Sequence, residues 1–163
     1  VPHLEVTVPV VPGVRKQLET ALDSWNVRPR LVHTESEKFA AYQTADAALV
    51  ASGTATLELA LARVPMVAAY RVEWLANLLM WMLTAHSVLL PNLIAGENFV
   101  PEFIHRDCTV ENLTRATIAL LTDQGARQVQ LAGFQVVAEK LAVGRMSPSV
   151  CAAGEILDLA RRE

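Results

Sequence analysis

The short glycine-containing segment 52–54 is the first candidate for a ligand-binding site in this sequence. It ends the apolar run 47–52 and opens a helical pattern within ASGTATLELALARVPMVAAYR, residues 51–71. The small residues let a ligand approach the backbone, and the first amides of a helix lack intrahelical partners. Together with the positive end of the helix dipole, the amides of Ser52, Gly53 and Thr54 suit a phosphate or pyrophosphate. The hydroxyl of Ser52 or Thr54 either adds a further donor or simply caps the helix.

Glu58 is the single acid of this oily segment and lies one to two turns inside the predicted helix. A carboxylate there would repel phosphates, but it can accept hydrogen bonds from vicinal hydroxyls, as an acid does for a ribose in dinucleotide-binding folds. The alternative is a solvated helix residue, or an acid favoured by the helix dipole.

Two further candidates follow the next predicted strands. Arg71 ends the strand 66–71 and either supplies a cation to the same crevice or lies on the surface. Asn92 ends the strand 87–92 and either bonds a base or sugar edge or makes a turn. Ligands of open α/β sheets bind at the carboxyl ends of strands. Candidates at three successive strand ends therefore favour a binding crevice.

The elements that must position these residues alternate between strand and helix patterns. We expect strands at 6–11, 28–33, 47–52, 66–71 and 87–92, and helices at 14–25, 37–45, 54–64, 74–85, 110–121, 126–142 and 149–162. Such alternation predicts an α/β fold, a Rossmann-like parallel sheet flanked by helices. We expect a Rossmann-like domain over 1–105, truncated at its N-terminus, and C-terminal helices over 106–163 that pack on it, on a missing domain or on a partner.

Composition excludes several other classes of protein. The 163 residues are 52% hydrophobic, which is enough for a real core and argues against disorder. A net charge of −3 with scattered basic residues argues against nucleic-acid binding. Cys108 and Cys151 have no CxxC spacing, so we expect neither a disulfide framework nor a metal site, and a reducing cytoplasm is the natural setting.

The most apolar stretch, 74–85, is too short to cross a membrane. It either is buried or lies on a membrane surface. No signal peptide is visible, and the chain begins without Met inside a strand pattern, so we expect a piece of a longer protein.

Three segments carry a family resemblance: ASGTATLELALARVPMVAAYR, LLPNLIAGENFVPEFI and PSVCAAGEILDLA. Over nearly the whole chain they resemble the carboxyl-terminal part of lipid-A-disaccharide synthases, GT-B glycosyltransferases of Gram-negative lipid A assembly. The resemblance implies an inverting transfer from UDP-2,3-diacylglucosamine to 2,3-diacylglucosamine 1-phosphate, with release of UDP. It implies that the domain over 1–105 binds the nucleotide sugar. It also implies contacts of Ser52, Gly53 and Thr54 with the diphosphate, of Glu58 with the ribose, and of Asn92 with the nucleotide or donor sugar.

The resemblance also implies what else the activity needs. Arg71 would be an auxiliary cation near the phosphates, and no metal or other cofactor would be required. The catalytic base would lie in an amino-terminal GT-B domain, so this chain is expected to bind without turning over; His86 is the one histidine of the chain that merits a test as base. Glu97 and Asn98 stand where many members carry a basic residue, so we assign no phosphate contact to that loop. The family is cytoplasmic and peripheral to the inner membrane and its substrates are acylated, which implies that Trp74, Leu78, Met80 and Trp81 form part of a surface for the membrane or the acyl chains. A homodimer stays open.

Two alternatives remain at this point. One is another GT-B protein that uses a UDP-sugar, either a transferase or an epimerase, although the segment PNLIAGE argues against it. The other is a non-enzymatic α/β interaction module in which Glu58 is a surface residue. Nucleotide binding separates the module from the enzymes, and selectivity for an acylated donor separates the two kinds of enzyme.

Overall fold

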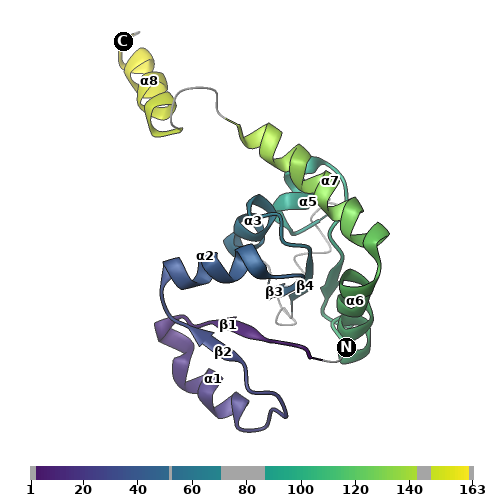
Figure 1. Ribbon diagram of the computed structural model, residues 1–163. Coiled ribbons are helices and arrows are strands. Elements are labelled where there is room, and N and C mark those ends of the chain that lie inside the picture. The colour runs from purple at the N-terminus through teal and green to yellow at the C-terminus, as the bar shows by residue number, and fades with distance from the viewer. Residues whose placement is uncertain (1–2, 52, 71–86, 143–147, 162–163) are drawn as a thin grey trace.

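The protein has an α/β fold in which every strand pair is parallel (Figure 1). The computed structural model describes residues 3–51, 53–70, 87–142 and 148–161. The strands are β1 (Thr7–Pro9), β2 (Arg30–Val32), β3 (Ala48–Ala51), β4 (Met66–Tyr70) and β5 (Glu102–Ile104). The helices are α1 (Arg15–Leu22), α2 (Glu35–Thr44), α3 (Thr54–Leu61), α5 (Leu90–Ala95), α6 (Val110–Thr122), α7 (Gln124–Leu141) and α8 (Pro148–Ala160), with a 3-10 turn η1 (Pro12–Val14) before α1. The predicted Rossmann-like arrangement of parallel strands flanked by helices is confirmed.

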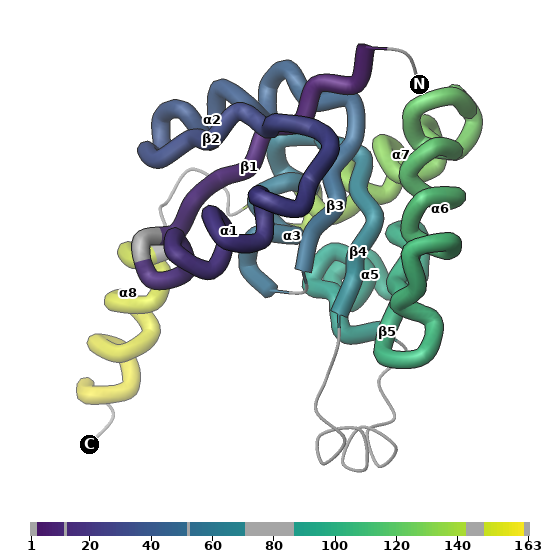
Figure 2. Tube along the Cα trace, turned by 90° about the horizontal axis from the view of Figure 1, so that it is seen from below, coloured from purple at the N-terminus to yellow at the C-terminus, as the bar shows by residue number. Residues whose placement is uncertain are grey.

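The strands form a pair, β1–β2, and a three-stranded sheet in the order β3–β4–β5. The pair lies on the β3 side of the larger sheet (Figure 2). In the central strand β4, Met66, Val67 and Ala68 are all buried. Because successive strand residues face opposite sides of a sheet, both faces of β4 must be covered, and α3 and α6 both pack against it. In β3, by contrast, the side chain of Leu49 is 58% exposed.

The predicted strand at 87–92 is wrong. Leu89 is only the extended cap of α5, which begins at Leu90 and has Pro91 in its first turn. Proline suits that position because its missing N–H has no intrahelical partner there and its φ is already helical. The helix ends after one and a half turns at Gly96, whose φ of 84° is the left-handed conformation that closes many helices. The third strand of the sheet is instead β5, which the sequence pattern did not predict.

The other predicted elements are confirmed with bounds that shift by at most three residues at either end, except the helix at 74–85, which lies outside the described residues. The strands β1 to β4 and the helices α1 and α3 are shorter than predicted, whereas α2 and α7 begin two residues earlier and α6 ends one residue later. Hydrogen bonds at the N-cap fix the residue at which α2 begins. Thr34 accepts a hydrogen bond from the Glu37 amide, and the Glu37 carboxylate accepts from the amides of His33 and Thr34, which is a capping box. At the C-terminal end of α3, Arg63 has a φ of 60°, which is a left-handed conformation. The helix therefore cannot continue to residue 64 as predicted.

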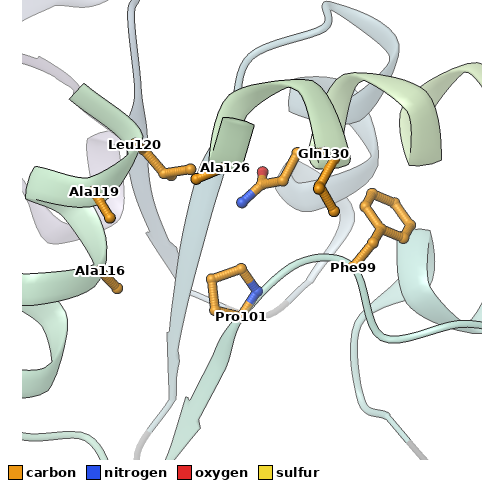
Figure 3. Close-up of a pocket in the computed structure, with 8 residues that line it drawn as sticks. Phe99, Pro101, Ala116, Ala119, Leu120, Ala126 and Gln130 are labelled. Atoms are coloured by element: carbon orange, nitrogen blue, oxygen red, sulfur yellow. The ribbon is translucent and has the colours of Figure 1, made fainter. Parts of the chain in front are cut away.

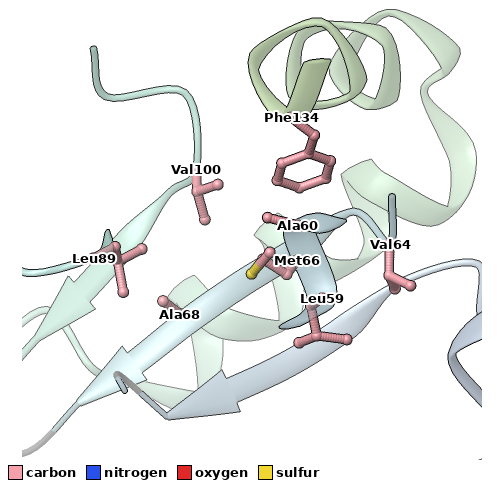
Figure 4. Packing of buried hydrophobic residues seen from close by; sticks show 8 residues of the cluster. All are labelled: Leu59, Ala60, Val64, Met66, Ala68, Leu89, Val100 and Phe134. Carbon is pink, nitrogen blue, oxygen red and sulfur yellow. The ribbon is translucent and has the colours of Figure 1, made fainter. Parts of the chain in front are cut away.

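The core lies between β4 and the helices α3, α5 and α7 (Figure 4). Phe134 of α7 is buried there and meets Phe99 edge to face, with ring centroids 5.5 Å apart. A Cβ at Gly133 would lie 2.3 Å from the Phe99 ring, so only glycine lets the ring approach α7. The buried Gln130 amide bonds the backbone of Met66 in both directions, at 2.7 and 2.9 Å. The Gln130 bonds attach α7 to β4, which pairs with β3, the strand that precedes the candidate site.

The last helix, α8, stands apart from the other elements in Figure 1. Its large apolar side chains at Val150, Ile156, Leu157 and Leu159 are exposed. Among the described residues, no helix is both long and apolar enough to cross a membrane.

Candidate functional site

The turn between β3 and α3 has the backbone conformation that the sequence suggested. Gly53, the residue that precedes α3, has φ 146° and ψ −166°, which residues with a side chain rarely adopt. The space where a Cβ would point is open, since no atom lies within 4 Å of it. The buried Thr56 hydroxyl donates to the Gly53 carbonyl at 2.7 Å and holds the turn in place. Backbone strain and open space therefore coincide at the start of α3.

The start of α3 offers donors to a ligand. No side chain among the described residues caps this helix, and both Gly53 and Thr54 are exposed. In the first turn the Thr56 amide donates to the Gly53 carbonyl at 3.2 Å. The amides of Gly53 and Thr54 have no such partner among the described residues, and the positive end of the helix dipole lies behind them. Such an end attracts an anion, and phosphate is the group most often bound in this way.

Glu58 lies one helical turn beyond Thr54. Residues four apart share a helix face, and four residues advance about 6 Å along the axis. The carboxylate is therefore on the face that the Thr54 hydroxyl occupies and is set back from the helix end. Its side chain is 36% exposed. The position allows a second polar group of a ligand to reach Glu58 while an anionic group meets the first turn.

The structure adds a residue that the sequence analysis missed, Lys38 of α2. Its ammonium lies 2.9 Å from Oε2 of Glu58 and 2.7 Å from Oε2 of Glu35. The Lys38 side chain is only 16% exposed. Hydrogen bonds to Glu35, and then to Glu58, raise the pKa of Lys38 above its ordinary value. Lys38 is thus charged and ties the first turns of α2 to the middle of α3.

Tyr42 of α2 also interacts electrostatically with the Glu58 carboxylate. Burial raises the pKa of its phenol, and the nearby negative charge of Glu58 raises it further. A hydrogen bond between the phenol and Glu58 raises this pKa as well, so the phenol is neutral at physiological pH. Glu58 is surrounded on the α2 side by one cation and one neutral hydroxyl.

Asn92 occupies a different environment from the exposed turn. It is fully buried at the start of α5, where its Nδ2 donates to the Val100 carbonyl at 3.0 Å and to Oε1 of Glu102 at 2.8 Å. Its Oδ1 accepts from the Val100 amide at 3.0 Å. Glu102 also accepts from the Ser87 hydroxyl and the Val88 amide. The observed bonds of Asn92 hold α5 to the segment that leads into β5.

Several predicted functional residues lie outside the described part of the chain. They are Ser52 and Arg71 of the candidate site, the apolar group Trp74, Leu78, Met80 and Trp81, and the histidine His86. The structure therefore brings together Gly53, Thr54 and Glu58 on one turn and helix, and it places Asn92 in the interior.

A separate pocket of about 310 Å³ lies between α6, α7 and the segment before β5 (Figure 3). Its lining includes Phe99, Pro101, Leu120 and Val129, and none of the candidate site residues. The amide of Gln130, which also lines it, already bonds the Met66 backbone. An apolar pocket without available polar groups does not suit a sugar nucleotide. Within residues 3–51, 53–70, 87–142 and 148–161, no group of three or more metal-ligating side chains occurs.

Lys38 was missed because its partner is twenty residues away along the chain. A signal was nevertheless present, since the pattern ESEKFAAY follows a predicted strand and Lys38 lies in the first turns of the helix that begins there. The rule that places Gly53 at the carboxyl end of β3 places Lys38 near the carboxyl end of β2.

Comparison with known proteins gives a consistent assignment. The chain matches the family described as lipid-A-disaccharide synthetase over residues 1–156. It is 43% identical over 156 residues to the lipid-A-disaccharide synthase of Rhodopseudomonas palustris strain BisB18, covering 95% of this chain and 39% of that protein. It is 41% identical over 165 residues to that of Nitrobacter winogradskyi, covering 99% of this chain and 41% of that protein. The chain spans about two-fifths of the length of the curated relatives that it matches. It belongs to the lipid-A-disaccharide synthetase family.

Proposed function

We propose that the chain is the UDP-sugar-binding part of a lipid-A-disaccharide synthase. In this proposal the complete enzyme is an inverting glycosyltransferase of lipid A biosynthesis. It joins UDP-2,3-diacylglucosamine to 2,3-diacylglucosamine 1-phosphate and releases UDP. The family match supports the reaction, and the printed names of the relatives agree with it. The geometry of the turn before α3 supports the assignment of donor binding to this chain.

The observation that carries the assignment is the open, strained turn at Gly53. In the proposed complex, the diphosphate lies against the amides of Gly53 and Thr54, where the absence of a Cβ lets it approach the backbone. The hydroxyls of Ser52 and Thr54 add donors, and Arg71 is an auxiliary cation. These groups stabilise the negative charge that develops on the departing UDP, so that no metal ion or other cofactor is required for that step.

Glu58 receives the ribose hydroxyls in the proposed complex. It is set back from the helix end by about one turn, so its charge is held away from the diphosphate while its carboxylate accepts two donors. Asn92 is assigned to the nucleotide or the donor sugar. Because both Nδ2 protons are used internally, such a contact requires the remaining acceptor capacity of Oδ1 or the replacement of an internal bond.

The reaction also needs groups that we place elsewhere in the enzyme. Inversion requires a base that takes the proton of the acceptor 6-hydroxyl as this oxygen attacks the anomeric carbon. We assign the base to an amino-terminal GT-B domain that completes the active site. Because its substrates are acylated, the complete enzyme would act at the cytoplasmic surface of the inner membrane. There the apolar segment with Trp74, Leu78, Met80 and Trp81 would contact lipid.

Calorimetric titration of the chain with UDP tests the proposal. We expect measurable binding to the wild-type chain and affinity reduced at least ten-fold, about 1.4 kcal/mol, in Glu58→Gln, because an amide replaces one of the ribose acceptors by a donor. The matched control is Glu19→Gln, which removes a carboxylate that pairs with Arg15 at 2.8 Å on α1, outside the site. The control should bind UDP as the wild type does. A folded wild-type chain without affinity for UDP would contradict the proposal.

A further inference from the structure

The side chain of Lys38 is held from three directions. Its ammonium contacts the carboxylates of Glu35 and Glu58 and lies 4.9 Å from the centre of the Phe39 ring. Glu35 lies three residues earlier on the same helix and is 77% exposed, whereas Glu58 belongs to α3. The contacts with Glu35 and Phe39 lie within α2 and orient the ammonium. The contact with Glu58 joins α2 to α3.

We propose that Lys38 is a positioning residue that orients the Glu58 carboxylate for the ribose of the bound nucleotide. This inference rests on the proposed function, because it concerns the same glutamate. A free glutamate side chain samples many rotamers, and ordering it on binding costs affinity. The ion pair between Lys38 and Oε2 restricts the carboxylate before a ligand arrives. The carboxylate keeps 36% of its side-chain surface exposed, so it remains open to donors from a ligand.

The same contacts argue against a direct role for Lys38 on the diphosphate. Its positive charge is already shared by two carboxylates within 3 Å. A phosphate that approached Lys38 would also approach Glu35 and Glu58, whose negative charges repel it. The ammonium therefore acts on the ligand through Glu58.

The test is a double-mutant cycle on UDP affinity in the full chain, with Lys38→Met, Glu58→Gln and the double variant. Methionine keeps most of the length of the unbranched side chain and removes its charge. We expect Lys38→Met to weaken UDP binding by about two- to ten-fold, the range that corresponds to ordering one side chain. In the Glu58→Gln background the same change should have almost no effect, because Lys38 then has no carboxylate to orient. Lys38→Arg retains the charge and should restore most of the affinity.

The matched control is Arg15→Met, which removes the cation of an exposed ion pair on α1. It should leave UDP affinity unchanged. Circular dichroism and the thermal midpoint confirm that each variant is folded. A purely structural role of Lys38 would lower the thermal midpoint and leave the affinity of the folded protein unaltered.

The outcomes separate this inference from the proposed function. If Glu58→Gln weakens UDP binding and Lys38→Met does not, the positioning role is overturned while the donor site stands. If Lys38→Met weakens binding equally in the wild-type and Glu58→Gln backgrounds, Lys38 acts independently of Glu58 and the inference is also overturned. If the folded wild-type chain has no affinity for UDP, the proposed function fails and the inference fails with it.

Discussion

Gly53 and Asn92 have similar sequence contexts but different structural environments. Both follow short apolar runs, and both were predicted to contact the ligand at the end of a strand. Gly53 is exposed, strained and adjacent to open space, which is the environment of a contact residue. Asn92 is buried, with its amide bonded to Val100 and Glu102. A buried amide that loses such partners leaves them unsatisfied. The observed role of Asn92 is therefore to hold α5, and its contact with the ligand stays a prediction.

The Gly53→Ala substitution tests the turn at the residue scale. Because the φ and ψ of Gly53 lie in a region that only glycine adopts readily, we expect a loss of about 1–3 kcal/mol in the free energy of unfolding. Crowding contributes nothing, since the added Cβ meets no atom within 4 Å. Urea unfolding measures the change. We also expect weaker UDP binding, because the methyl group points into the space assigned to the diphosphate.

Gly13→Ala is the matched control for that substitution. A Cβ at Gly13 also meets no atom, but its backbone is outside the left-handed region. The stability of this variant should change by less than about 0.5 kcal/mol, in the range of ordinary surface substitutions. Equal losses in the two variants would show that the conformation of Gly53 is not the cause.

At the scale of single elements, the start of α2 is set by its capping box. The exposed Glu37 carboxylate accepts bonds from the backbone of His33 and Thr34 and from the Thr34 hydroxyl. These bonds favour the charged carboxylate, the His33 backbone bond most of all, and they lower the pKa of Glu37 from its ordinary value of 4.5. The cap that starts the helix carrying Lys38 is therefore sensitive to acid.

The pH dependence of unfolding checks this cap. Because the pKa of Glu37 is lower in the folded state, its contribution to stability is present above pH 4.5 and is lost as the pH falls through the lowered folded value. Glu37→Gln keeps a hydrogen-bonding side chain at the same helix position and removes the titration. Urea unfolding of both proteins as a function of pH should show a stability advantage of the wild type that shrinks in acid. Parallel stability curves would rule out the proposed contribution of Glu37.

The elements also show which structural features could be predicted from the sequence. The order of β1 to β4 and of the helices between them followed from the apolar periodicity. The error at 87–92 arose because an apolar run that ends in Pro91 fits either a strand end or the first turn of a helix. The short β5 was missed because three residues with one acid, Glu102, carry no periodic signal. In the structure, that acid is compensated by donors from Ser87, Val88 and Asn92.

At the scale of the whole molecule, the candidate site depends on contacts between segments that are far apart in the sequence. The turn at Gly53 and the carboxylate of Glu58 were predictable because they share one local segment. The ion pair between Lys38 and Glu58 was not, since it requires the packing of α2 beside α3. The attachment of α7 to β4 through Gln130 was hidden for the same reason. Local patterns thus identified the turn at Gly53 as a candidate site, and tertiary packing added Lys38, the residue that we propose positions Glu58.

The most direct test of the account compares UDP with 2′,3′-dideoxyuridine diphosphate on the wild-type chain and on Glu58→Gln. The central claim is that Glu58 binds the ribose hydroxyls. It predicts that wild-type affinity falls by ten-fold or more when the hydroxyls are absent, and that Glu58→Gln binds both nucleotides with nearly the same reduced affinity. If the substitution and the loss of hydroxyls instead weaken binding independently, so that their effects add, Glu58 does not contact the ribose and the central claim is wrong.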